Sequence, residues 1–275
     1  MHRFCFHILI AAISCVSLSA QTSTSKSDAK KVEKPKTEIS VVALGPKPTR
    51  KYKEVEGAEG PIMLMSKPGQ TPPSRLYYKG KAEGDKKTAW QPFNISFNNP
   101  SSMRTIEPGK ALELYRKLPD DGGYKKYVTI PAAVEGSRRV FFLIPSIIGP
   151  TPWEKEPHVR TILISSKSME GKQFILKNLS KFTILHAFEN SVVSVEPMKI
   201  ISYTRPKSGE LYRLAARYGT EKKIIYNTAV RLNDEGHIQL YVLYNANPRT
   251  NSGRSVGVFR TVIPARKIPE LAPKP

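Results

Sequence analysis

The feature that most constrains the fold is a succession of short apolar or alternating runs, each closed by turn-forming residues. Turn signals such as NNP, PDDGG, NDEG and NPRTNSG separate the runs. The runs are FNISF, KYVTI, RVFFLIP, RTILISS, FTILHAF, KIISY, KKIIY, IQLYVLY and FRTVIP. Ile, Val, Tyr, Phe and Thr between turn clusters are typical of strands in a sandwich or barrel. We therefore predict an all-β fold.

Parts of this pattern recur in the same order along the chain. The tetrapeptide ELYR occurs at 113–116 and again at 210–213, although one such match arises easily by chance in 275 residues. The flanking matches are Phe93 with Phe182, Glu107 with Glu196, Lys125-Lys126 with Lys222-Lys223, Val140 with Leu240, and Arg160 with Arg260. Ordered matches predict a duplication. We expect two tandem, antiparallel β-sandwich-like domains at 74–166 and 172–266; two generic β patterns remain the alternative.

In this alignment several polar and aromatic residues would be framework shared by both domains. These anchors are Glu107 with Glu196, Tyr115 with Tyr212, Arg116 with Arg213, and Arg160 with Arg260. The two glutamates would occupy equivalent places in separate domains, which disfavours a catalytic carboxylate pair across one cleft. At the ELYR segments a helical spacing of Leu211, Leu214, Ala215 and Tyr218 competes with a strand pattern, and we favour strands.

The first 20 residues have the pattern of an export signal. Arg3 precedes an apolar run from Phe4 to Val16, and small or polar residues follow as far as Ala20. The run is shorter than a spanning helix needs. Cys15 also leaves open a lipoprotein signal, but Ala12 stands where a larger aliphatic residue is usual. We expect an exported protein that is periplasmic, on the outer surface or secreted.

Composition separates the two ends of the chain from the predicted domains. Residues 21–58 are rich in Lys, Ser, Thr and Pro, with one short apolar patch at Val41–Leu44, and we predict a disordered tether. Residues 267–275 are predicted to be a flexible tail. Cys5 and Cys15 are the only cysteines, so cleavage of the signal would leave no disulfide and no thiol chemistry.

Catalytic signatures are missing from the sequence. It has no GxSxG, HExxH or GxxxxGK[ST] motif. His158, His186 and His237 are each isolated, and we expect His186, inside an apolar run, to be a core histidine. We therefore predict no enzyme activity, no metal site and no cofactor, with an envelope hydrolase as the least favoured hypothesis.

Positive charge is the remaining functional signal. The formal net charge is +21, and both predicted domains and the tether are basic. Such charge attracts anionic polysaccharide, lipopolysaccharide or membrane surfaces, whereas the sequence lacks the basic and aromatic interleaving expected for RNA binding. We expect a non-catalytic binding or structural protein. The candidate binding residues are Lys125, Lys126, Lys222 and Lys223, together with Trp90 and Trp153 for the alternative of a carbohydrate-binding module.

Overall fold

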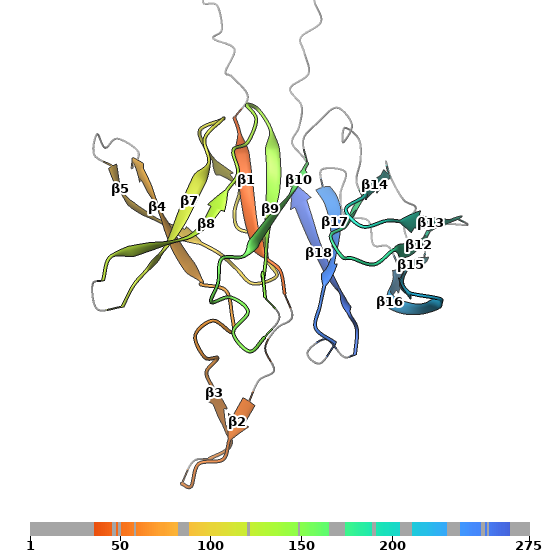
Figure 1. Cartoon of the computed structure of the whole chain (residues 1–275), viewed down its shortest axis with the longest axis horizontal. Helices are drawn as coiled ribbons and strands as arrows, with labels where there is room; N and C mark the ends of the chain where they lie inside the picture. Colours follow the sequence, from red (N-terminus) through yellow and green to blue (C-terminus); the bar gives the residue numbers. More distant parts are fainter. Residues whose placement is uncertain are drawn as a thin grey trace, which may run out of the picture. The chain divides into compact units, whose positions relative to one another are not determined.

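The computed structural model describes residues 36–45, 48, 51–57, 59–81, 88–119, 122–147, 149–164, 174–188, 191–203, 211–229, 237–248, 251 and 253–264. The predicted export signal, both cysteines and the predicted tail lie outside these residues. The described part of the chain forms eighteen strands and no helix, which confirms the all-β prediction (Figure 1). Every strand pairing in it is antiparallel except β1 with β9 and β11 with β17.

The first half of the described chain contains two four-stranded sheets. Sheet I has the order β10 (His158–Leu163), β9 (Arg138–Ile144), β1 (Glu38–Ala43) and β6 (Arg104–Thr105). Sheet II has the order β5 (Thr88–Asn94), β4 (Arg75–Lys81), β7 (Leu112–Lys117) and β8 (Tyr124–Ile130). A further hairpin, β2 (Lys51–Lys53) with β3 (Ile62–Leu64), forms a two-stranded sheet of its own.

The second half repeats this topology. Sheet III has the order β18 (Val256–Pro264), β17 (His237–Asn245), β11 (Phe174–Asn178) and β14 (Ile200–Tyr203). Sheet IV has the order β13 (Ser191–Val195), β12 (Ile184–Phe188), β15 (Leu211–Tyr218) and β16 (Glu221–Ala229). Each strand of sheets I and II therefore has a counterpart with the same partners and the same directions.

Individual hydrogen bonds repeat as well. The amide of Leu44 donates to the carbonyl of Leu143 at 2.8 Å, and the amide of Leu179 donates to that of Leu243 at 2.7 Å. A β-bulge occurs at the same place in both halves, where one extra residue, Tyr127 in β8 or Ile225 in β16, faces the partner strand. Such a bulge re-aims a side chain, and both extra residues are buried.

This register corrects the predicted alignment of the halves. When the two halves are aligned at their bulges, Leu114 is equivalent to Leu214. The two ELYR segments therefore lie in corresponding strands, but the alignment is shifted by three residues. An odd shift turns side chains to the other face of a sheet. Leu114 is accordingly buried and Leu211 exposed, whereas Tyr212 is buried and Tyr115 is not. The anchors Tyr115 with Tyr212 and Arg116 with Arg213 are therefore not equivalent.

The other predicted anchors also fail. Arg160 pairs with Phe142 in sheet I, and the corresponding position in sheet III, opposite Val242, is Phe259 rather than Arg260. Glu107 follows β6, but Glu196 precedes the corresponding strand β14. Glu107 contacts Lys110 at 2.8 Å, and Glu196 accepts a hydrogen bond from Thr183 at 2.7 Å. Both carboxylates make local structural contacts.

The boundary of the predicted tether is wrong as well. Residues 38–43 lie within the predicted tether at 21–58 and well before residue 74, but they form β1, an inner strand of sheet I. Five of the six residues of β1 are buried. Strands covered on both faces are unbroken apolar runs without alternation. The apolar patch at Val41–Leu44 indicates this strand in the sequence. The Lys- and Pro-rich residues around the patch favour the prediction of a disordered tether instead.

Three apolar clusters hold the sheets together. One lies between sheets I and II and includes Ile39, Leu114 and Trp153; the second lies between sheets III and IV and includes Phe174 and Leu214. The third combines residues of both halves. Its members on sheet I and sheet III include Val42, Leu44, Val140, Phe142, Leu240, Val242 and Phe259. Both halves therefore contribute to one common apolar cluster.

Replacing Phe142 should test this common cluster. Its ring is fully buried and lies 6.3 Å, centre to centre, from the ring of Phe259. Phe142→Ala should lower the free energy of unfolding by about 3–5 kcal/mol, because it removes apolar burial and leaves a cavity. Urea denaturation measures this change. Val134→Ala, at a side chain that is 65% exposed, is the matched control, and equal stability of the two variants would contradict the packing.

Candidate functional site

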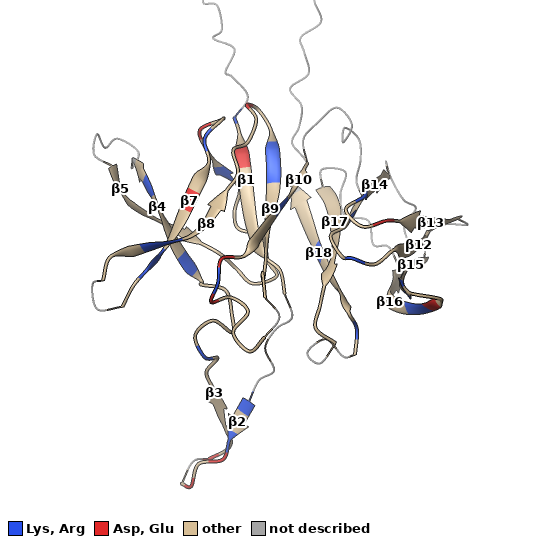
Figure 2. Cartoon of the chain, viewed as in Figure 1, with Lys and Arg blue, Asp and Glu red and all other residues tan. Residues whose placement is uncertain are grey.

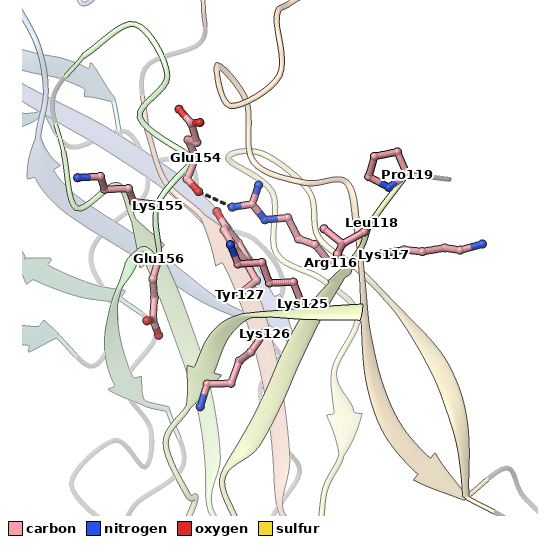
Figure 3. Close-up of a pocket in the computed structure, with 10 residues that line it drawn as sticks. All are labelled: Arg116, Lys117, Leu118, Pro119, Lys125, Lys126, Tyr127, Glu154, Lys155 and Glu156. Carbon is pink, nitrogen blue, oxygen red and sulfur yellow. Dashed lines mark hydrogen bonds between the residues drawn. The ribbon is translucent and has the colours of Figure 1, made fainter. Parts of the chain in front are cut away.

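A pocket of about 600 Å³ lies between the β7–β8 hairpin and the segment that joins β9 to β10 (Figure 3). Its lining residues come from the end of β7, the start of β8 and positions 154–156 of the joining segment. They are Arg116, Lys117, Leu118, Pro119, Lys125, Lys126, Tyr127, Glu154, Lys155 and Glu156. The pocket therefore contains two of the four predicted lysines, Lys125 and Lys126.

Arg116 and Tyr127 form a fixed wall of the pocket. The Arg116 Nη2 donates hydrogen bonds to the carbonyls of Glu154 and, at 3.4 Å, of Trp153 (Figure 3 shows the first). Its guanidinium carbon lies 4.1 Å from the centre of the Tyr127 ring. The Tyr127 hydroxyl donates to the Trp153 carbonyl at 3.1 Å. These contacts fix the position of the guanidinium through a cation–π contact and through backbone acceptors.

The electrostatics of the pocket favour an anion. Among the described residues, five cationic side chains line it and two carboxylates, those of Glu154 and Glu156. Lys125 lies directly opposite Arg116 in the β7–β8 register. Like charges on directly opposed residues are destabilising. An anion bound between them would remove this repulsion.

Neither Lys126 nor Tyr127 is suited to act as a base. Lys126 contacts Glu113 at 3.1 Å, and the hydrogen bond with that carboxylate raises the lysine pKa further above its ordinary value. Burial raises the pKa of the Tyr127 hydroxyl to about 12. Both groups therefore keep their protons at neutral pH.

Trp153 does not fit the alternative of an exposed, sugar-stacking residue. Its side chain is only 1% exposed, and it belongs to the core between sheets I and II. The ring packs edge-on against Phe97, with 5.9 Å between ring centres. Trp153 therefore contributes its backbone carbonyl to the pocket, and its indole cannot stack on a sugar in this conformation.

Trp90 lies in a different place, on the outer face of sheet II. Its ring stacks on Tyr124 with 3.9 Å between centres and meets Tyr115 edge-on at 5.0 Å. The Lys79 ammonium lies 5.3 Å from the Trp90 ring centre. The structure therefore separates the two predicted tryptophans, and neighbouring aromatic rings already occupy the face of Trp90.

The lysine pair of the second half is not equivalent to that of the first. The registers align Lys125 with Lys223 and Lys126 with Ile224, so the predicted pairing is one residue off. Lys223 contacts Glu221 at 3.3 Å. Lys222 lies opposite Arg217 on the other face of sheet IV. The lysine pair of the first half and that of the second half therefore occupy different environments.

The sequence did not indicate that Arg116 and the 154–156 segment would meet. The sequence predicts Arg116 only as a repeat anchor. Arg116 and Glu154 are 38 positions apart in the chain. The WEKE sequence at 153–156 placed charge beside a tryptophan, but nothing local showed that the tryptophan would turn inward. Long-range sheet packing decided both points.

Comparisons with known proteins add no assignment. No known protein family matches the chain, and no curated protein matches it either. Among the described residues, no cluster of His, Cys, Asp and Glu has an arrangement suited to a metal ion. The same part of the chain contains no helix long and apolar enough to cross a membrane.

The described histidines do not converge on the pocket. His186 is fully buried in the core between sheets III and IV, as expected of a core histidine. Rings of Phe174, Phe188, Tyr203 and Tyr212 surround it, with centres 5.0–6.3 Å away. The Tyr203 hydroxyl lies 3.0 Å from Nδ1, while Nε2 is buried without a hydrogen-bond partner. Burial lowers the pKa of His186 to about 4.

This histidine should make stability depend on pH. The unfolded chain binds the proton with an ordinary pKa near 6.5, and the folded chain only near 4. The stabilisation is therefore present above pH 6.5 and is lost as the pH falls toward 4, by up to about 3 kcal/mol. His186→Phe should flatten this part of the urea-denaturation profile. His158→Gln, at an exposed histidine, should leave it unchanged; an unaltered profile in His186→Phe would contradict the assignment.

Proposed function

We propose that the protein is an exported, non-catalytic binding protein of the cell envelope or exterior. Its first half binds the acidic groups of an anionic polymer, such as an acidic polysaccharide, in the pocket around Arg116. The observation that carries this proposal is the opposed pair Arg116 and Lys125. Two backbone carbonyls hold Arg116, and three further lysines line the same pocket. The formal charge of +21 adds long-range attraction for such polymers.

The shape of the pocket favours a polymer over a flat membrane surface. Arg116 is partly buried between the hairpin and the joining segment, so a ligand must project an acidic group into the pocket to reach it. A carboxylate or sulfate on a chain can do so and can accept a charge-assisted hydrogen bond from a guanidinium N–H group that the carbonyls leave free. Lys117, Lys126 and Lys155 would then contact neighbouring acidic groups along the polymer.

A carbohydrate-binding module that uses tryptophans has less support. Trp153 is buried in the core, and Trp90 is stacked on Tyr124. The hypothesis of an envelope hydrolase has less support from the pocket, because five cationic side chains line it and burial raises the pKa of its tyrosine to about 12. Binding of acidic groups is the function that these residues support best.

Removing two pocket charges tests the proposal. The double variant Lys125→Ala and Lys155→Ala should bind a polyuronate or a sulfated polysaccharide roughly tenfold more weakly, a change of about 1.4 kcal/mol. Titration calorimetry at low and at high salt measures this affinity, which should fall as salt increases because salt screens charge.

A double variant with the same loss of charge is the control. Lys110→Ala and Lys199→Ala remove two exposed lysines outside the pocket and should weaken binding less than twofold. Equal losses in the two double variants would show diffuse attraction and contradict a pocket. Binding to phosphatidylglycerol vesicles without binding to either polysaccharide would contradict the polymer.

A further inference from the structure

The β2–β3 hairpin is an apolar surface without a covering sheet. Residues 51–57 and 59–65, here called the arm, include a two-stranded sheet in which all six strand residues are exposed. Its large apolar side chains are Tyr52, Val55, Ile62, Met63, Leu64 and Met65, with exposed fractions from 43% to 90%. Contiguous exposed apolar residues mark interaction sites, and an isolated hairpin is only marginally stable.

The arm is also unusual in its charge. The turn at 54–60 has the sequence EVEGAEG, with three carboxylates and no cation, in a chain of formal charge +21 (Figure 2 shows acidic residues at this turn). The arm is inserted between β1 and β4. The topological equivalents of these strands, β11 and β12, are separated by only the five residues 179–183. An arm of this kind therefore belongs to the first half alone.

A complementary surface lies on the outer face of sheet IV. Register places Leu185 beside Ala215 and Ala215 beside Ile224, and Ala187 beside Val192. Val192 is 69% exposed and Ile224 60% exposed. Three exposed cations border this apolar centre: Arg213, Arg217 and Lys222. These eight residues are here called the docking face.

The corresponding face of the first half is different. The counterparts of the five apolar residues, read from the two registers, are Tyr77, Lys79, Trp90, Tyr115 and Lys126. There Trp90 packs against Tyr115, and Lys126 pairs with Glu113. Only the second half therefore has a bare apolar centre with a cationic border.

The border itself is suited to carboxylates. Arg217 and Lys222 lie directly opposite each other, and opposed like charges are destabilising. Carboxylates placed between them would relieve the repulsion. The arm carries an apolar surface and three carboxylates near its turn, with Lys51 and Lys53 in β2, and the docking face carries an apolar surface next to three cations.

We propose that the arm of one copy binds the docking face of a second copy, in a head-to-tail arrangement. Apolar side chains of the arm cover Leu185, Ala215 and Ile224, and Glu54, Glu56 and Glu59 contact the cationic border. Because the two contacting surfaces are different parts of the chain, repetition of this contact gives either a ring or a filament. This assembly is independent of the pocket around Arg116, which contains no residue of the arm or of the docking face.

Two single variants test the arrangement. Met63→Lys places a charge on the arm, and Ile224→Lys places one in the centre of the docking face. Burying an unpaired charge is costly, so each variant alone should sediment as a monomer at concentrations where the wild-type chain associates. Val134→Lys, at another exposed apolar residue, should associate like the wild type.

The decisive measurement is made on a mixture of the two variants. The intact arm of Ile224→Lys should bind the intact docking face of Met63→Lys. The altered arm of Met63→Lys and the altered docking face of Ile224→Lys should bind nothing. The mixture should therefore give 1:1 dimers and nothing larger, measured by sedimentation velocity with folding checked by circular dichroism. A monomeric wild type at all concentrations, a single variant that still associates, or a mixture that stays monomeric would each overturn the proposal.

Discussion

The whole arrangement depends on a strand that is buried on both of its faces. In β1, Ile39 and Val41 point into the core with sheet II, while Val42, and Leu44 just after the strand, join the cluster that both halves share. Strand β11 repeats this, with Phe174 and Leu176 on one side and Ile175 on the other, where Leu179 follows the strand. Each strand is held by a parallel partner, β9 or β17, with apolar residues on both faces. Neither strand could be exposed to water on one side without losing much of its apolar burial.

This constraint explains which parts of the fold could be predicted. The strand runs and their turns are local features, and their composition was enough to give the all-β class. The register is not local, because a shift by one residue leaves the composition of a strand unchanged while reversing its faces. The ELYR match placed corresponding strands together yet three residues apart, and Arg160 with Arg260 was one residue off. Equivalent bulges and hydrogen bonds resolve the register, and a sequence alone contains neither.

The candidate site was predictable only in part for the same reason. Lys125 and Lys126 stood out as an exposed basic pair beside a turn, which their own sequence could show. Arg116 became a pocket residue because the segment after β9 folds back and offers it two carbonyls, and that contact depends on Trp153 being in the core. The tryptophan was predicted as a candidate ligand contact, but burial of its large apolar surface outweighs any gain from exposure.

The two halves differ where their common core allows it. Inner faces of the sheets must supply apolar residues at fixed positions, and Leu114 with Leu214 or Phe93 with Val195 satisfy that need in both halves. Strand ends and outer faces are free of this requirement. In the first half the cations surround an arginine anchored by backbone carbonyls, a geometry suited to a projecting acidic group. In the second half they surround an apolar centre, which suits a partner that offers both apolar and acidic side chains. The positive charge common to both halves therefore supports two different kinds of contact, because its immediate neighbours differ.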